Sequence, residues 1–468
     1  MIKSEQVRID VSSLRFNEMK IGLLFILALV LDGARLNQAL EDTEADEDGL
    51  TLEEFFEMTE FEDDHHQTQK SEDSPQIATP STSSATMALK HEGAVKTLAQ
   101  ANDAFKAKLY PLLVQTAGQD QNMVMSGFSA SAVLAMAFMG ATGQTASQLQ
   151  TGLALPEDQE PLRAGFEELF EVLKSNENFT MEAANRLYVH QNYELLGDFL
   201  KATLAHFKAE TENVDFSQEA KARQTINDWV SERTHDKIKD LIPEGVLSDL
   251  TRLVLVNAVY FKGLWANKFD AKHTSEGDFQ LLNGETVKVP MMKISEKFRA
   301  IMNKDLNATI LEMPYKGDRL AMLIFLPRKA DGFQALEEKF PSLDLTQLNL
   351  SQPNKFDVAL PKFKFESTHD LVSPLKAMGI QDMFDKSQAD FSGISAQKDL
   401  YVSAVMQKAF IEVNEEGTEA AAATSAIMMT RAMIMTPRFV CDRPFLFAIR
   451  DNLTGMTLFS GRVMDPSK

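Results

Sequence analysis

The segment from Glu415 to Thr424 constrains the fold more than any other part of this chain. It reads Glu-Glu-Gly-Thr-Glu, followed by four alanines and a threonine. A helix is unfavourable here, because Thr424 and the threonines and isoleucines that follow it prefer extended backbone. Read as a strand, the segment has an uncharged, mostly small face opposite a face that carries Glu419, with a period of two. This pattern predicts a strand that slips between two others.

The same segment also has the features of an exposed loop. It continues to Arg431 and then to a polar bend at Thr436-Pro437. Gly417 supplies backbone freedom near its start. Because the segment has the features of both a loop and a strand, we expect it to change from an exposed loop to a strand.

The N-terminus has the pattern of a secretion signal. Lys20 precedes an apolar run from Ile21 to Leu31, which ends at Asp32-Gly33-Ala34. The run is too short to span a bilayer. We therefore predict a signal peptide over residues 1–34, with Met19 as an alternative start, and a secreted, extracellular protein. A buried core segment and a signal anchor are the alternative interpretations.

Residues 35–92 differ in composition from the rest of the chain. Between Glu41 and Asp73 there are fifteen acidic residues and one basic residue, Lys70, so this stretch carries a net −14 of the formal −21. Such a segment cannot bury enough apolar surface to fold alone, and we predict an acidic, Ser/Thr-rich, disordered extension. One interpretation is a solvated spacer. The other is docking on a basic groove of a partner, because Phe55 lies among the acids with other apolar residues.

From residue 93 onward the pattern becomes globular. Apolar residues recur at helical spacing near the start of this region, and another helix is expected around residues 166–173. Strand-like runs occur at 253–261, 320–326, 357–365, 401–413 and 444–449. Helices crowd the first half and strands the second, which predicts an α+β fold rather than βαβ repeats. The single cysteine, Cys441, excludes an internal disulfide and is interpreted as a buried free thiol.

Several motifs between residues 93 and 468 together resemble the serpin family, in the family's order. They include Asn185-Arg186-Leu187-Tyr188, Leu255 to Trp265, Leu360-Pro361-Lys362-Phe363 and Arg443-Pro444-Phe445-Leu446-Phe447. The resemblance implies one serpin domain over 93–468. Its expected fold has helices packed around a large, mostly antiparallel main sheet, with smaller sheets and an exposed reactive-centre loop.

The resemblance also assigns roles to the Glu415–Thr424 segment and to the residues that follow it. In the family's spacing the cleaved residue lies sixteen positions after the first Glu, which makes Arg431-Ala432 the scissile bond. An Arg at this position fits the carboxylate-floored pocket of a trypsin-like protease. The implied hinge residues are Glu415, Glu416, Gly417, Thr418, Glu419, Ala420, Ala421, Ala422, Ala423 and Thr424.

The implied function is that of a suicide-substrate inhibitor of trypsin-like serine proteases, which regulates an extracellular proteolytic cascade. Cleavage triggers insertion of residues 417–430 into the main sheet and traps the acyl-enzyme as a covalent complex. The alternative is a non-inhibitory serpin with a binding, storage or chaperone role, which proteases only cleave. No motif of an enzyme, metal site or phosphate loop occurs, so we expect no catalytic activity, metal or cofactor.

Other residues resemble the family's supports for a sheet that opens. Ser126, Ser129 and Asn257 resemble the polar cluster under the parting strands, and Trp265 resembles the aromatic residue at the top of the opening. Two departures stand out: Gly127 replaces the usual proline, and Gln407 replaces the usual histidine. Glutamine cannot titrate, which removes any pH-linked role from that position.

Few partners besides a protease are expected. The helix that binds heparin in many serpins offers here only Arg163 and Lys174, so heparin binding through it is not expected. We expect no nucleic acid or membrane partner and a monomeric protein, and the acidic extension is a candidate for contact with a basic protease exosite. Four sequons, at Asn178, Asn307, Asn349 and Asn452, are candidate glycosylation sites in an exported chain.

Overall fold

The computed structural model describes residues 89–416 and 436–468. All of them belong to the unit Leu52–Lys468. The signal region 1–34 and the extension up to residue 88 lie outside the described residues, as do residues 417–435. The described part is built from helices and two sheets, and the α+β prediction is confirmed.

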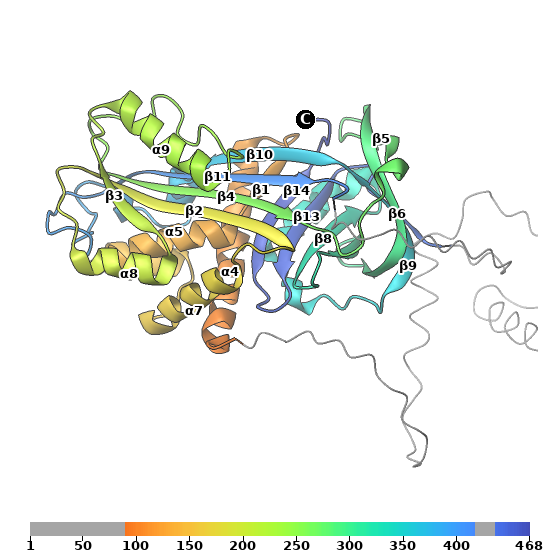
Figure 1. Ribbon diagram of the computed structural model, residues 1–468, viewed down its shortest axis with the longest axis horizontal. Helices are drawn as coiled ribbons and strands as arrows, with labels where there is room; N and C mark the ends of the chain where they lie inside the picture. Colours follow the sequence, from red (N-terminus) through yellow and green to blue (C-terminus); the bar gives the residue numbers. More distant parts are fainter. Residues whose placement is uncertain (1–88, 417–435) are drawn as a thin grey trace, which may run out of the picture. The chain divides into compact units, whose positions relative to one another are not determined.

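Most helices precede most strands, as the sequence predicted, and lie on both sides of a sheet of long strands (Figure 1). The α-helices are α4 (Glu92–Ala117), α5 (Gly127–Gly140), α6 (Gly143–Gly152), α7 (Gln159–Val172), α8 (Gly197–Phe207), α9 (Glu219–Arg233), α10 (Phe333–Lys339) and α11 (Val372–Ala377). The 3₁₀ turns are η2 (Ala271–His273), η3 (Ala330–Gly332), η4 (Phe340–Ser342), η5 (Leu345–Gln347) and η6 (Asp382–Phe384).

The sheet of long strands has five members, in the order β10-β11-β4-β2-β3. They are β10 (Phe363–Asp370), β11 (Val402–Val413), β4 (Leu253–Gly263), β2 (Phe179–His190) and β3 (Glu210–Val214). In Figure 1, α9 covers one face of this sheet, and α5 and α8 lie on the other. Alternate β4 residues serve the two faces: Val256 packs in the cluster beneath α9, and Leu255 packs in the larger core.

The second sheet has nine strands, in the order β1-β14-β13-β8-β7-β6-β9-β12, with β5 paired to β6. Its pairs are antiparallel except for β9 with β12. The strands are β1 (Met123–Met125), β5 (Ser275–Gln280), β6 (Thr286–Asn303), β7 (Ala308–Pro314), β8 (Leu320–Pro327), β9 (Asn354–Pro361), β12 (Arg438–Val440), β13 (Phe445–Asp451) and β14 (Thr457–Val463).

The five-stranded sheet is mixed. β11 pairs with β10 antiparallel but with β4 parallel, and β2 pairs with β4 antiparallel but with β3 parallel. The mostly antiparallel pattern that was expected for the main sheet therefore holds only for the nine-stranded sheet. Two parallel neighbours cannot be joined by a short hairpin. The chain accordingly runs through much of the nine-stranded sheet between β4 and β11.

One expected strand is in fact two. The run 357–365 is divided at Lys362, whose backbone N–H donates to the carbonyl of Pro290. Residues up to Pro361 belong to β9 in one sheet, and residues from Phe363 belong to β10 in the other. An uninterrupted run of strand-forming residues does not reveal where the chain changes sheets.

The start of α5 explains one departure from the family pattern. Ser126 caps the helix, because its side chain accepts a hydrogen bond from the Ser129 backbone N–H at 3.1 Å. A Cβ atom on Gly127 would lie 2.9 Å from Oδ1 of Asn102 and 3.4 Å from Cβ of Lys106. A proline ring at residue 127 would therefore crowd α4, and glycine fits.

Candidate functional site

The described part of the hinge lies just beyond the end of β11. Glu415 and Glu416 are described, whereas Gly417 to Thr424 and the bond Arg431-Ala432 lie outside the described residues. The roles of those residues remain predictions. What the structure provides is the anchorage of the first hinge residues and the strands next to them.

Glu415 is anchored by two residues that lie far away in the sequence. Its carboxylate accepts a hydrogen bond from Thr274 Oγ1 at 2.9 Å and forms an ion pair with Lys362 Nζ at 2.8 Å. Only 15% of the Glu415 side chain is exposed. Burial raises the pKa of this carboxyl, but the bonds from Lys362 and Thr274 outweigh it, and the pKa lies below its usual value.

Glu416 is held by β4, which lies on the other side of β11 from β10. Its carboxylate pairs with Lys262 of β4 at 2.5 Å, and its backbone N–H donates to Asn414 Oδ1 at 2.9 Å. The hydrogen bond from Lys262 is the main cause of its lowered pKa. Successive hinge residues are thus tied to different strands: Glu415 to the β9–β10 junction and Glu416 to β4.

Trp265 lies at the same end of the sheet. Its indole Nε1–H donates to the carbonyl of Asn414 at 3.0 Å, and its ring stacks on Tyr315 at 4.5 Å between centroids. The Trp265 side chain is buried. This stacked aromatic pair is hydrogen-bonded through Trp265 to the residue just before Glu415. It therefore fixes the backbone at the point where the loop begins.

A buried polar cluster lies under the seam between β4 and β11. We define it as Ser126, Ser129, Asn185, Asn257 and Gln407, none of which is more than 5% exposed. Gln407 and Asn257 are register partners on the two strands, and Gln407 Nε2 donates to Asn257 Oδ1 at 2.6 Å. Asn257 Nδ2 in turn donates to Ser129 Oγ and to Asn185 Oδ1.

The cluster joins the seam to the helix below it. Gln407 donates from Nε2 to the Ser126 carbonyl at 2.9 Å and accepts from the Ser126 N–H at 3.3 Å, and Ser126 Oγ donates to the Leu458 carbonyl at 2.7 Å. Parting the two strands breaks the Gln407–Asn257 bond, and each buried group left unpaired costs about 1–3 kcal/mol. These hydrogen bonds bring together the four members that the sequence predicted, which are Ser126, Ser129, Asn257 and Gln407.

A histidine lies one strand away from the position where the family pattern expects one. His369 of β10 is the register partner of Gln407, is 5% exposed, and donates from Nε2 to the Val124 carbonyl at 2.9 Å. Burial lowers its pKa, and the bond to Val124 opposes this only partly. Sequence reasoning missed His369, because only strand pairing brings it next to Gln407.

The four sequons differ in accessibility. Asn307 and Asn349 are exposed. Asn452 is exposed too, but its Nδ2 donates to the Asp318 carbonyl at 3.0 Å. The Asn178 Oδ1 atom is buried and has no hydrogen-bond partner among the described residues. Asn307 and Asn349 are therefore the sequons best placed for modification.

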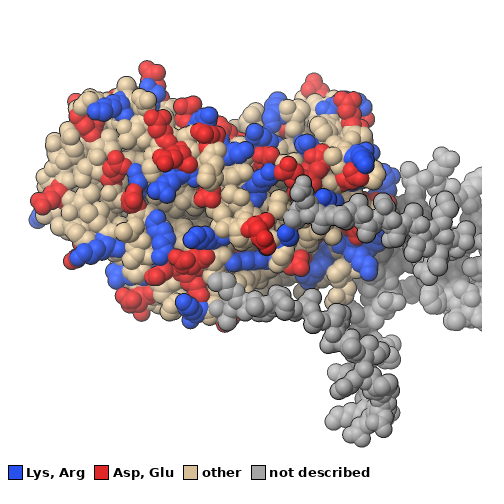
Figure 2. All heavy atoms as spheres, viewed as in Figure 1, with Lys and Arg blue, Asp and Glu red and all other residues tan. Residues whose placement is uncertain are grey.

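The helix expected to lack heparin-binding character is α7. Arg163 is its only basic residue, and the side chain pairs with Glu160 at 3.2 Å. On the face drawn in Figure 2, basic and acidic side chains are interspersed. Within residues 89–416 and 436–468, no group of three metal-ligating side chains occurs. No helix in the described part is long and apolar enough to cross a membrane.

The chain was compared with known families and proteins. The family model described as "Serpin (serine protease inhibitor)" matches residues 100–466. Serpin B6 of Macaca fascicularis is 40% identical over 380 residues, which are 79% of this chain and 99% of the relative. The leukocyte elastase inhibitor of Bos taurus is 40% identical over 382 residues, with the same shares.

Solved structures give the same picture. Serpin48 of Tenebrio molitor, described as a highly specific serpin, is 36% identical with a TM-score of 0.71, over 79% of this chain and 98% of that one. Native protease nexin-1 with heparin is 32% identical with a TM-score of 0.72, over 80% of this chain and all of that one. Both likenesses span nearly the full length of the related chain.

Proposed function

This chain belongs to the serpin family, and from this premise we propose that it is a suicide-substrate inhibitor of trypsin-like serine proteases. Its reactive bond is Arg431-Ala432. The Ser hydroxyl of the protease attacks the Arg431 carbonyl, the bond to Ala432 breaks, and an ester joins Arg431 to the protease. The loop then inserts into the five-stranded sheet before water hydrolyses the ester.

One observation carries this proposal: β11 and β4 are parallel neighbours, and the hinge begins at the edge where both end. A strand that turns back after Glu416 runs antiparallel to β11. Because β4 is parallel to β11, the same strand is antiparallel to β4 as well. It can therefore form ladder hydrogen bonds on both edges once the seam opens.

The residue types of the loop favour rapid insertion. Thr418, Ala420, Ala422 and Thr424 supply a small, uncharged inward face. No unpaired charge has to be buried as they pass between the strands. Rapid insertion matters because hydrolysis of the ester competes with it, and the outcome depends on which step is faster.

Incubation with trypsin followed by denaturing electrophoresis tests the proposal. We expect an SDS-stable band at the summed mass of the protease and the inhibitor without residues 432–468, which separate once the bond is cut and the sample is denatured. Arg431→Ala is the matched control and should remove this band while the protein stays folded, because a loop side chain contributes little to the core. Persistence of the band with this variant would place the reactive bond elsewhere. Arg438 is poorly suited, because it lies in β12, a strand that pairs with β9.

A non-inhibitory role is the second candidate. The fold also carries ligand binding in a relative: human thyroxine-binding globulin complexed with its ligand is 30% identical, with a TM-score of 0.73. Complete cleavage by trypsin with full protease activity left, and no SDS-stable band, would favour this role over inhibition.

Secretion and the domain limits belong to the same proposal. The family domain at 93–468 is supported by relatives that match 79% of this chain but 99% of their own length.

We assign residues 1–34 to a signal peptide, and Asn307 and Asn349 to glycosylation. Expression of the full chain in secreting cells should give protein in the medium whose mass falls on glycosidase treatment. Retention inside the cells would contradict this assignment.

The proposed inhibitor acts as a monomer within an extracellular cascade of trypsin-like proteases. The acidic extension is a further candidate contact for such a protease. Light scattering of the purified chain checks the first point, since a dimer would have twice the 52.2 kDa calculated for the full sequence.

A further inference from the structure

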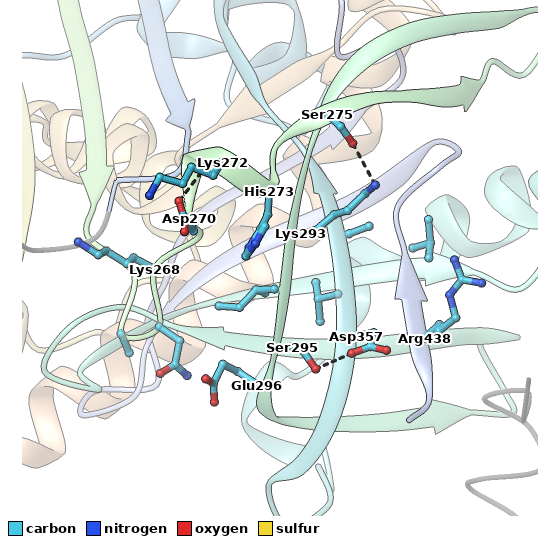
Figure 3. Close-up of a pocket in the computed structure, with 16 residues that line it drawn as sticks. Lys268, Asp270, Lys272, His273, Ser275, Lys293, Ser295, Glu296, Asp357 and Arg438 are labelled. Atoms are coloured by element: carbon cyan, nitrogen blue, oxygen red, sulfur yellow. Dashed lines mark hydrogen bonds between the residues drawn. The ribbon is translucent and has the colours of Figure 1, made fainter. Parts of the chain in front are cut away.

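An open cavity of about 1030 Å³ lies beside the hinge (Figure 3). Its walls come from the segment that follows Trp265 and from strands β6, β9 and β12. Figure 3 shows Lys268, Lys272 and His273 on one side of the cavity and Arg438 on the other.

The cations of this cavity lack acidic partners among the described residues. Lys268, Lys272 and Arg438 form no ion pair there, and Lys293 donates only to Ser275 Oγ, at 3.0 Å. A carboxylate beside a basic side chain would neutralise its charge locally. Four basic side chains without an ion pair in the described part, around one cavity, leave positive charge available to a partner.

Three carboxylates also line the cavity, and two of them are engaged locally. Asp270 accepts the Lys272 backbone N–H at 3.0 Å, and Asp357 accepts Ser295 Oγ at 2.5 Å. Glu296 is the third. The local negative charge therefore offsets part of the positive charge, but no carboxylate within residues 89–416 and 436–468 forms an ion pair with the four cations.

The positive charge continues along the sheet beyond the cavity. Lys297 of β6 and Lys355 of β9 are direct register partners, and neither has an ion pair among the described residues. Like charges opposite each other in a sheet are destabilising. We call the whole set the cationic face; it consists of Lys268, Lys272, Lys293, Lys297, Lys355 and Arg438.

The same cavity has an apolar component. Ile294, Val358, Ala359 and Val440 line it between the cations, and Ala266 lies at its edge. A ligand that fits this surface carries negative charges with apolar side chains among them. Phosphate or sulfate alone would leave the apolar part unused.

We propose that the cationic face binds residues 52–64 of the chain's own acidic extension. That segment reads Leu-Glu-Glu-Phe-Phe-Glu-Met-Thr-Glu-Phe-Glu-Asp-Asp and carries no basic residue. Its apolar residues are Leu52, Phe55, Phe56, Met58 and Phe61, and its carboxylates are Glu53, Glu54, Glu57, Glu60, Glu62, Asp63 and Asp64. The segment matches the face in charge and in its interleaved apolar groups.

The connecting chain is long enough for this contact. Leu89, the first described residue, lies 25 positions after Asp64. Fully extended, this stretch spans about 85 Å, and a domain of this size is on the order of 50 Å across. The connection therefore reaches any part of the domain surface without strain.

The location gives the contact a consequence for the proposed inhibitor. Thr274, which anchors Glu415, lies between His273 and Ser275, and both of these line the cavity. A segment bound there lies next to the residue that anchors Glu415, at the start of the hinge. High salt releases it, because the Debye length falls to about 3 Å at 1 M.

Carbodiimide cross-linking of the full chain tests the contact, because it forms amide bonds only between touching carboxylates and amines. After digestion and mass analysis, we expect cross-links from residues 53–64 to Lys268, Lys272, Lys293, Lys297 and Lys355, lost at 1 M NaCl. They should exceed links to Lys201 and Lys221, which are exposed elsewhere, at least fivefold. Equal links to all of these lysines would overturn the proposal. Links found only between two molecules would do the same.

Charge reversal sharpens the test. The double variant Lys297→Glu, Lys355→Glu should lower cross-linking to Lys268, Lys272 and Lys293 several-fold, and the control Lys201→Glu, Lys221→Glu should leave it unchanged. Equal melting temperatures for both variants show that folding is intact. Unchanged cross-linking in the first variant would contradict the proposal. No protease is present, so failure of the inhibitory function would leave this result unaffected.

Discussion

At the residue scale, two charges and one aromatic side chain hold the start of the hinge. Glu415 and Glu416 are adjacent in sequence, yet the Glu415 side chain is 15% exposed and bonded twice, whereas the Glu416 side chain is 65% exposed. A buried ion pair that loses one partner leaves an uncompensated charge, whereas an exposed pair contributes little. The two neighbours therefore form a matched pair for mutation.

Glu415→Gln should lower the free energy of unfolding by about 1–3 kcal/mol, because the Glu415 carboxylate is only 15% exposed and loses its ion pair with Lys362. Glu416→Gln should cost less than about 1 kcal/mol, since the Glu416 carboxylate is 65% exposed and solvent screens its pair with Lys262. Urea unfolding of both variants measures the difference. Equal losses would mean that the two anchors are equivalent.

His369 should make stability depend on pH between 5 and 7. Burial lowers the pKa of His369 in the folded protein. In the unfolded chain the pKa of this histidine is about 6.5, so the unfolded state binds the proton more readily once the pH falls below that value. Stability is therefore complete above pH 6.5 and falls as the pH drops, by up to about 1.4 kcal/mol per pH unit.

His369→Gln is the control for this effect, because glutamine can still donate to the Val124 carbonyl. Urea unfolding at pH 7 and pH 5 should show a smaller loss in the variant. His190, whose pKa is also lowered by burial, remains in both proteins. The same loss in both proteins would assign the pH dependence to His190 or to other groups.

At the element scale, the seam between β4 and β11 is the part of the sheet that the proposed insertion opens. It joins two parallel strands whose side chains meet at Gln407 and Asn257 over the buried polar cluster. An arriving strand must replace that contact and fill the ladder on both sides. Its inward residues therefore decide how fast it enters.

Thr418→Arg should convert the inhibitor into a substrate. Arginine at the first inserted position would bury an unpaired charge, which costs several kcal/mol. Cleavage at Arg431 should stay fast, so the ratio of inhibitor consumed to protease inactivated should rise at least tenfold. This ratio is measured by titrating trypsin activity, with Glu419→Arg on the opposite face as the control. An unchanged ratio would show that Thr418 does not enter the sheet.

At the scale of the whole molecule, the proposed mechanism requires that the intact chain is not the most stable arrangement that its sequence allows. In that mechanism the five-stranded sheet accepts residues 417–430 as a sixth strand between its parallel neighbours β11 and β4. The proposed inhibitor stores this difference until the reactive bond is cut.

Cleavage at Arg431 should therefore raise the melting temperature of the protein. Roughly ten new ladder hydrogen bonds at about 1 kcal/mol each predict a rise on the order of 10 °C or more for a domain of this size. Calorimetry of intact and cleaved protein measures it. A melting temperature that does not change on cleavage would contradict strand insertion and favour the non-inhibitory role.

Properties that depend on local residue patterns and on the order of motifs along the chain could be predicted from the sequence. The α+β class follows from helical and strand periodicities, and the family follows from motifs such as Leu255 to Trp265. The strand character of the hinge, which is predicted from its period of two, stays a prediction, because its residues from Gly417 on lie outside the described residues. These properties depend on residues that are neighbours in the sequence, so no tertiary structure is needed to find them.

Contacts between residues that are far apart in the sequence follow only from the tertiary structure. Thr274 and Glu415 are 141 positions apart, and Asn257 and Gln407 are 150 apart. His369 lies beside Gln407 only because β10 pairs with β11, and the division at Lys362 exists only because β9 and β10 belong to different sheets. The cationic face, likewise, gathers residues from β6, β9, β12 and the segment that follows Trp265. Sheet register fixes all of these contacts, and register depends on the packing of the whole domain rather than on any local pattern.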